Sequence, residues 1–153
     1  MIIGVPKESY PGERRVALVP MVIPNLVKAG FEVLVETGAG AEAGYPDALY
    51  VEEGAKILAD RRAVFGRADV VVQVLCYGSN DVTGQADLPL LRSEQVLVGF
   101  LRPLGSVDGN VTRLSAKTGC SAAKGALVPF GIQSRTSAYD TSDHVLARAL
   151  KIG

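Results

Sequence analysis

The sequence lacks tryptophan, contains one histidine and two cysteines, and carries no net charge, with 16 basic and 16 acidic residues. Cys76 and Cys120 lie far apart and form no C-x-x-C pair, which excludes a disulfide framework and a zinc ribbon. A single His144 excludes a histidine-rich metal site, so we expect no metal. The balanced charge argues against nucleic acid and against an anionic membrane surface as direct partners.

Long hydrophobic runs are also missing. None approaches the ~20 apolar residues that a membrane-spanning helix needs. Residues 1–8 have no charged segment followed by a long apolar stretch, so they predict no signal peptide. With 153 residues, 48% of them apolar, the chain can bury roughly 68–70% of its unfolded surface. We therefore expect a single cytosolic globular domain.

Short apolar runs rich in valine and isoleucine are what the sequence does contain. They are mostly not alternating, which predicts strands buried on both faces, as in a parallel sheet. These predicted strands are Ile2–Val5, Val16–Val19, Phe31–Val35, Val70–Val74 and Val96–Leu101. The predicted helices are Met21–Ala29, Pro46–Glu53, Asp60–Phe65, Leu88–Ser93, Ser106–Lys117 and His144–Ile152. Strands and helices alternate, which favours an α/β sheet with right-handed crossovers.

Glycines and prolines set the expected helix ends. Gly30, Gly54 and Gly66 follow the first three helices and predict their termination. Pro24 does not suit a helix interior, so the first helix either starts near Pro24 or kinks there.

A glycine-rich loop at Gly38–Gly44 follows a predicted strand and resembles a dinucleotide-binding turn. Its last glycine comes one position too late for G-x-G-x-x-G, and Pro46 interrupts the place of the phosphate-binding helix. No acidic residue ends a following strand about 20 residues later. An ordinary glycine-rich loop is therefore favoured over a nucleotide site.

Charged and polar side chains follow the predicted strands, where ligands of open α/β sheets bind. These strand-end residues are Lys7, Glu8, Glu36, Leu75, Cys76 and Arg102. If Glu13–Pro20 returns antiparallel, Arg15 reaches the same edge, and Arg15 and Arg102 can hold a carboxylate or phosphate. The alternative is that these are rim residues without a ligand. The fold class is then doubly wound α/β, mostly parallel, with an antiparallel edge.

The two thiols and the histidine offer weaker candidates. Cys76 and Cys120 have no neighbouring His or C-x-x-C partner, so buried inert thiols are favoured over reactive ones. His144 lies on the polar side of its predicted helix, which favours a surface position. No nucleophile elbow or catalytic triad is indicated.

Several motifs together resemble the alanine dehydrogenase and pyridine nucleotide transhydrogenase family. They are GVPKE at 4–8, ERRVALVP at 13–20, GFEVLVETGAG at 30–40, ADVVVQV at 68–74 and VLVGFL at 96–101. The resemblance covers roughly residues 1–120. It implies the first part of a doubly wound domain, lacking the Rossmann dinucleotide domain that follows in the family. We accordingly divide the chain into residues 1–125, the family's N-terminal α/β domain, and residues 126–153, a divergent tail or hinge.

The resemblance also implies site residues. Arg15 matches the family's substrate-carboxylate arginine, whereas Leu75 and Arg102 stand where alanine dehydrogenases have a lysine and a histidine. Leucine cannot replace the lysine charge, and arginine cannot act as a neutral general acid or base near pH 7. The transhydrogenase alpha subunit, which lacks that pair, therefore fits better.

In the tail, Ser134, Arg135 and Asp140 match the spacing of a transhydrogenase segment that contacts the nicotinamide. Ile132 and Ser137 depart from that segment, where the family has Arg and Gln. We expect Ser134, Arg135 and Asp140 to contribute to cofactor binding, and we assign no catalytic residue.

The resemblance thus implies an oxidoreductase part that takes NAD(H), with NADP(H) on a partner subunit. The implied reaction is hydride transfer between NADH and NADP⁺, coupled to proton translocation in a complete complex. Its expected partners are a second copy in a homodimer and the NADP-binding and membrane subunits. The expected location is cytoplasmic, peripheral to the inner membrane. The alternatives are an alanine dehydrogenase-like oxidoreductase and a non-catalytic binding or dimerisation module.

Overall fold

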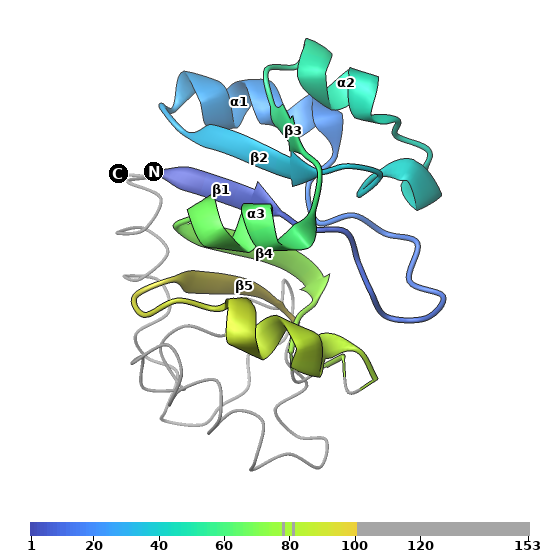
Figure 1. Cartoon of the computed structure of the whole chain (residues 1–153). Coiled ribbons are helices and arrows are strands. Elements are labelled where there is room, and N and C mark those ends of the chain that lie inside the picture. The colour runs from blue at the N-terminus through green and yellow to red at the C-terminus, as the bar shows by residue number, and fades with distance from the viewer. Residues whose placement is uncertain (78, 81, 101–153) are drawn as a thin grey trace, which may run out of the picture.

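A five-stranded, wholly parallel sheet forms the centre of the computed structural model, which describes residues 1–77, 79–80 and 82–100 (Figure 1). The strands are β1 (Ile2–Val5), β2 (Glu32–Glu36), β3 (Lys56–Leu58), β4 (Val70–Leu75) and β5 (Val96–Phe100). The α-helices are α1 (Ile23–Lys28), α2 (Asp47–Glu52) and α3 (Arg61–Arg67). The 3₁₀ helices are η1 (Pro20–Val22), η2 (Ala41–Ala43) and η3 (Gly84–Leu90).

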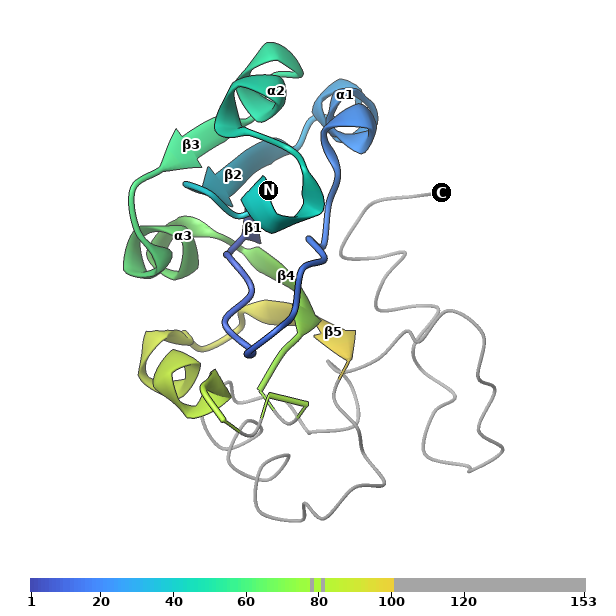
Figure 2. The same cartoon turned by 90° about the vertical axis from the view of Figure 1, so that its right-hand side faces the viewer.

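The strand order β3-β2-β1-β4-β5 makes the fold doubly wound. The chain builds β1, β2 and β3 in one direction, then returns to place β4 and β5 on the other side of β1. The α1 and α2 helices lie on one face of the sheet, and α3 and η3 lie on the other (Figure 2). The direction of winding therefore reverses between β1 and β4, where such sheets open a crevice at the carboxyl ends of their strands.

Apolar residues fill both faces, as the continuous valine runs predict. On one face Val5, Val33 and Val35 pack with Ile23 and Tyr50 from the helices. The core of the other face is the cluster of Phe65, Ala68, Val71, Cys76, Tyr77, Leu91 and Leu97. Helices thus cover both faces of the sheet with apolar residues, which confirms the predicted α/β class.

Most helix boundaries follow from local chemistry. The helix α1 begins at Ile23 with Pro24 in its first turn, where a missing N–H costs nothing. The Asp60 side chain caps α3 by accepting a hydrogen bond from Ala63 N at 2.8 Å. Gly30 and Gly54 have φ of +86° and +96° and end α1 and α2 as expected. Gly66, however, lies inside α3 and does not end it.

The predicted strand Val16–Val19 is wrong, and with it the antiparallel edge. These residues form no strand; Val16, Ala17 and Leu18 pack against the core beside α1 and α2. The Leu18 carbonyl accepts a hydrogen bond from the Tyr50 hydroxyl at 2.9 Å instead of joining a ladder.

Two further differences concern short elements. The edge strand β3 replaces the predicted antiparallel edge, and the sequence pattern did not predict it. In place of the helix expected at Leu88–Ser93, the earlier and tighter η3 contains Pro89.

The helices expected at Ser106–Lys117 and His144–Ile152 lie outside the described residues. Within the described part of the chain, no helix has the length and apolarity to cross a membrane.

Candidate functional site

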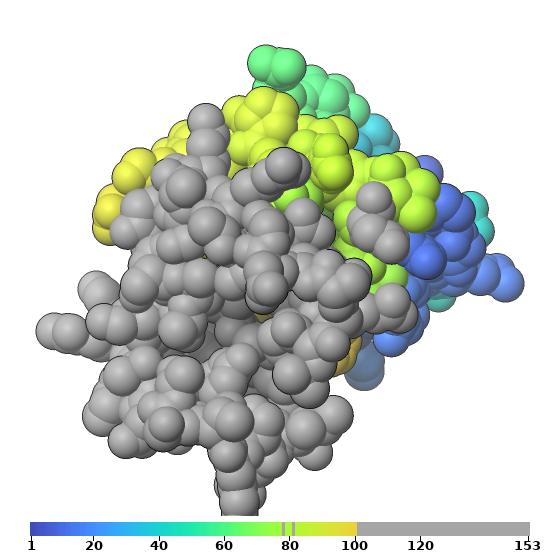
Figure 3. All heavy atoms as spheres, turned by 90° about the horizontal axis from the view of Figure 1, so that it is seen from below, coloured from blue at the N-terminus to red at the C-terminus, as the bar shows by residue number. Residues whose placement is uncertain are grey.

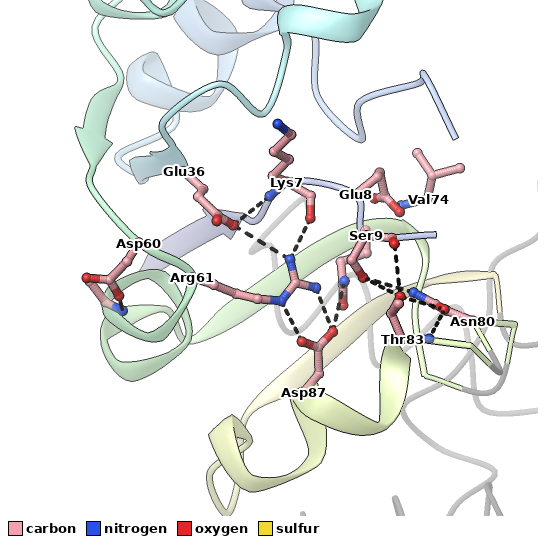
Figure 4. Close-up of polar contacts among 12 residues, drawn as sticks. Lys7, Glu8, Ser9, Glu36, Asp60, Arg61, Val74, Asn80, Thr83 and Asp87 are labelled. Carbon is pink, nitrogen blue, oxygen red and sulfur yellow. Dashed lines mark hydrogen bonds and ion pairs between the residues drawn. The ribbon is translucent and has the colours of Figure 1, made fainter. Parts of the chain in front are cut away.

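The candidate site, called the mouth below, is the carboxyl end of the sheet between β1 and β4, where the strand order reverses and where doubly wound sheets bind ligands. The loop after β1 carries Lys7, Glu8 and Ser9, and the segment after β4 begins at Cys76. The space-filling view shows the green segment before η3 directly against the blue loop that follows β1 (Figure 3). Three groups of polar contacts join these segments, as the close-up shows (Figure 4).

Arg61, on the first turn of α3, makes the first group. Its Nη2 donates to Asp87 Oδ2 at 2.6 Å, and its Nη1 donates to the Lys7 carbonyl. Nη1 also lies 3.6 Å from Glu36 Oε2. Burial works to lower the pKa of Arg61, but the Asp87 hydrogen bond and the neighbouring carboxylates outweigh it and raise that pKa. The guanidinium therefore stays charged and joins the loop after β1 and the end of β2 to η3.

Asp87 is the buried partner in this group, with only 3% of its surface exposed. Its Oδ2 also accepts a hydrogen bond from the Gln73 side chain at 3.3 Å. The pair is charge-assisted and bidentate, the geometry that arginine suits and lysine does not.

Glu8 makes the second group, with the end of β4. Its Oε1 accepts from Val74 N at 2.6 Å and its Oε2 from Leu75 N at 3.1 Å. Burial raises the pKa of this carboxyl, although the two N–H donors favour the charged form. The carboxylate thus spans the crevice from the β1 side to the β4 side.

Ser9, Asn80 and Thr83 make the third group. Asn80 Nδ2 donates to Ser9 Oγ at 3.0 Å, and Thr83 Oγ1 donates to the Ser9 carbonyl at 2.9 Å. Thr83 N in turn donates to Asn80 Oδ1 at 2.9 Å. These bonds fix the loop after β1 against the segment that leads into η3.

Arg15 lies on the rim of this mouth rather than within it. Its Nε and Nη2 donate to the Glu13 carboxylate at 2.8 and 2.6 Å. This pair holds the pKa of Glu13 down at about 2. Arg15 also attracts the Glu8 carboxylate electrostatically, so Arg15, Glu8 and Leu75 belong to one end of the sheet. With 63% of its side chain exposed, Arg15 is reachable from solvent.

The other predicted site residues fall into two sets. Leu75 is half-buried at the end of β4, with its N–H held by Glu8. Arg102, Ser134, Arg135 and Asp140 lie outside the described residues.

The glycine-rich loop Gly38–Gly44 is closed by the chain itself. Gly38 N donates to Asp47 Oδ1 at 2.8 Å, so the backbone amide that a phosphate needs is already used. A Cβ at Gly40 would lie 2.7 Å from the Tyr50 ring, so this glycine is required for packing. The loop holds only the 3₁₀ turn η2. This geometry fits the interpretation as an ordinary loop.

Cys76 is a buried thiol, and burial raises its pKa to about 12. A thiol with that pKa remains protonated near neutral pH and is a poor nucleophile. The prediction of a buried thiol is confirmed for Cys76, whereas Cys120 lies outside the described residues. Among the described residues, no three His, Cys, Asp or Glu side chains group closely enough to hold a metal ion.

Sequence reasoning missed Arg61 and Asp87. The strand-end rule found Lys7, Glu8 and Leu75, because each lies at or shortly after the carboxyl end of a parallel strand. Arg61 and Asp87 lie on helices 26 residues apart, and no spacing rule relates them. The sequence marked the segment of Arg61 only as part of the predicted helix Asp60–Phe65.

The sequence and the fold have known counterparts. A family model described as "Alanine dehydrogenase/PNT, N-terminal domain" matches residues 4–137. The NAD(P) transhydrogenase subunit alpha of Cereibacter sphaeroides is 37% identical over 108 residues, which are 71% of this chain and 20% of that protein. The alanine dehydrogenase of Bacillus subtilis is 47% identical over 74 residues, 48% of this chain and 19% of that protein.

A solved structure named L-alanine dehydrogenase superposes with a TM-score of 0.66 at 34% sequence identity. The match covers 76% of this chain and 30% of that one. The chain therefore spans about a fifth of the length of the two curated relatives and about a third of this structure.

Proposed function

Since the chain belongs to the alanine dehydrogenase/PNT N-terminal domain family, we propose that it serves as the N-terminal domain of an NAD(P) transhydrogenase alpha subunit. The two curated relatives described above are a transhydrogenase subunit and a dehydrogenase by name, so a part in nicotinamide-dependent oxidoreduction is common to both branches. The proposed reaction is hydride transfer between NADH and NADP⁺, coupled to proton translocation in the complete complex.

Leu75 is the observation that favours the transhydrogenase branch. Its apolar side chain stands at the end of β4, where the resemblance gives alanine dehydrogenases a lysine. A leucine offers a substrate carboxylate neither charge nor hydrogen bond. Arg15, the cation that the resemblance assigns to that carboxylate, already has one edge bound to Glu13. A small amino or oxo acid bound to Arg15 would therefore use the free edge of its guanidinium.

NAD(H) is the proposed cofactor, and its nicotinamide supplies the hydride chemistry. The described residues do not form a cradle for it, because Asp47 holds Gly38 N and Tyr50 fills the space over Gly40. We assign the proposed cofactor contacts to Ser134, Arg135 and Asp140, and the described crevice to one wall of the cleft. NADP(H) is proposed on a partner subunit, with a homodimer and membrane subunits as further partners.

A chimera tests the proposal. Residues 1–153 would replace the corresponding segment of the Cereibacter sphaeroides alpha subunit, assembled with its partner subunits. We expect hydride transfer from NADH to an NADP⁺ analogue, and no NADH production from L-alanine and NAD⁺. Absence of transhydrogenation in an assembled complex contradicts the proposal.

The second candidate, an alanine dehydrogenase-like oxidoreductase, is favoured by the exposed guanidinium of Arg15 at the crevice rim. Its test joins the chain to the remainder of the Bacillus subtilis enzyme. We expect no alanine oxidation unless Leu75→Lys and Arg102→His are introduced together. Activity without these changes would support the second candidate over the first.

A further inference from the structure

The end of β4 extends past the strand beside it. β1 pairs with β4 only at Ile3↔Val70 and Gly4↔Val71, whereas β4 continues to Leu75. The backbone N–H groups near the end of β4 therefore have no β1 backbone to receive them. Backbone N–H groups that no neighbouring strand pairs with can bind another chain or an anion.

A bulge turns two of these N–H groups toward one point. Val72 pairs with Val98 and Leu75 with Phe100, so two residues of β4 stand opposite Gly99 alone. In a regular strand, consecutive N–H groups point to opposite edges. Here Val74 N and Leu75 N both reach the carboxylate of Glu8, at 2.6 and 3.1 Å.

The bulge is also fixed from the β5 side. A Cβ at Gly99 would overlap the Gln73 carbonyl oxygen and lie 3.1 Å from Cys76 Sγ. The backbone of β4 therefore occupies the space that any other residue at position 99 would need. The convergent N–H pair is a built feature of the sheet, held by Gly99 on one side and by Glu8 on the other.

We propose that the Val74 and Leu75 N–H groups form a carboxylate-binding site at the switch point, which the chain fills with its own Glu8. Two parallel N–H···O bonds to the two oxygens of one carboxylate are the pattern by which an external carboxylate would bind. Filled by Glu8, the site holds the end of β4 in place and excludes other anions from this part of the crevice. That the anions excluded by Glu8 include a substrate carboxylate rests on the proposed function. The carboxylate-binding site itself does not depend on it.

The charged surroundings of Glu8 are mixed. Glu13, from the loop after β1, repels its carboxylate, whereas Arg61 of α3 and Arg15 of the rim attract it. Cys76, at the end of β4, is protonated near neutral pH and adds no charge. The two N–H donors and the two arginines therefore favour a negative charge at this point, whereas burial and Glu13 oppose it.

Chemical rescue tests the proposal. In Glu8→Ala, we expect the Val74 and Leu75 amide proton resonances to move upfield as their acceptor is lost. Sodium acetate should restore them saturably, in the millimolar range, whereas sodium chloride at equal ionic strength should not. The wild-type chain should show no saturable change with acetate, because Glu8 already fills the site.

Glu36→Ala is the matched control. Glu36 also offers a carboxylate to a backbone N–H in this mouth, that of Lys7, at 2.8 Å. Loss of the Glu36 carboxylate should shift the Lys7 amide proton resonance and leave the Val74 and Leu75 amide proton resonances unchanged. The proposal is overturned if a folded Glu8→Ala chain keeps the wild-type Val74 and Leu75 resonances, or if acetate does not restore them.

Glu8→Gln keeps the side-chain shape and answers the question should Glu8→Ala not fold. In the wild type, the Val74 and Leu75 amide shifts should follow one carboxyl titration, and this step should vanish in Glu8→Gln. Its persistence in the variant contradicts the proposal. These measurements need neither NAD(H) nor activity, so a failed chimera and a failed rescue remain distinguishable.

Discussion

At the scale of the residue, Arg61 and Asp87 form the most consequential polar pair of the described structure. The Asp87 side chain is 4% exposed and that of Arg61 is 19% exposed. Removing one partner of such a pair leaves an uncompensated buried charge, which costs about 3–5 kcal/mol. We therefore expect Arg61→Ala to lower the free energy of unfolding by about that amount in urea denaturation.

Arg67→Ala provides the control for this prediction. Arg67 also lies on α3 and faces Glu32 at 3.4 Å, but its side chain is 50% exposed. Exposed pairs contribute about 0–1 kcal/mol, so this variant should lose little stability. Equal losses of unfolding free energy in Arg61→Ala and Arg67→Ala would contradict the prediction that burial of Asp87 makes its pair with Arg61 the stronger one.

Glu13 predicts a pH dependence of stability. Its hydrogen bond with Arg15 lowers the carboxyl pKa from 4.5 to about 2 in the folded chain. The ionised pair therefore contributes stability above pH 4.5, and this contribution is lost as the pH falls toward 2. The free energy of unfolding of Glu13→Gln should lie below that of the wild type above pH 4.5. This difference should shrink as the pH falls from 4.5 toward 2, as measured by urea denaturation. A deficit that stays constant from pH 6 to pH 2 contradicts this assignment.

The individual residues of the candidate site were predictable to different extents. Glu8 and Leu75 follow parallel strands, so the strand-end rule brings them to one edge. That Glu8 binds the Leu75 N–H was not predictable, because it depends on a bulge that no local pattern announces. The pairing of Arg15 with Glu13 likewise appears only when the loop conformation is known.

At the scale of the element, the bulge of β4 sets a strict requirement on β5. Gly99→Ala should destabilise the chain, because its Cβ would overlap Gln73 backbone rather than a movable side chain. Overpacking typically costs about 1–3 kcal/mol, and we expect the upper part of that range. The loss is measured as a shift of the denaturation midpoint at unchanged slope.

Gly66→Ala is expected to have the opposite effect. Gly66 lies inside α3, and a Cβ there would meet no atom within 4 Å. Replacing an interior helix glycine with alanine stabilises a protein by about 0.5–1 kcal/mol, and we expect a gain of that size. A loss of stability in this variant would mean that Gly66 is needed where it stands.

The elements themselves were predictable where burial and length agree. The strands β1, β2, β4 and β5 are four to six residues long and consist mainly of apolar residues. The edge strand β3 has three residues and begins with an exposed lysine, so it carries no such signal. Val16–Val19 carries the same signal as a strand, but the Tyr50 hydroxyl and the apolar core beside α2 hold it instead.

At the scale of the whole molecule, two loops at the carboxyl edge of the sheet are closed by carboxylates of the chain. Glu8 fills the N–H pair at the end of β4, and Asp47 fills Gly38 N after β2. Backbone N–H groups at this edge are what dinucleotide-binding sheets offer to phosphate. In the described residues of this doubly wound sheet, these three N–H groups are therefore already bound by side chains of the chain itself.

This occupation leads to the prediction that the chain alone does not bind NADH with a Kd in the low micromolar range. A pyrophosphate at Gly38–Gly44 would have to displace Asp47, whose carboxylate also accepts from Thr37 Oγ1 at 2.6 Å. It would then meet the Tyr50 side chain packed over Gly40, and no helix of the length needed to stabilise its charge begins in this loop.

Titration calorimetry or NADH fluorescence measures the affinity, and Asp47→Ala, which frees Gly38 N, is the informative variant. We expect weak binding by the wild type, and also by Asp47→Ala because Tyr50 still packs over Gly40. Low-micromolar binding by the wild type contradicts the prediction, and such binding by Asp47→Ala alone would show that Asp47 is what blocks the loop.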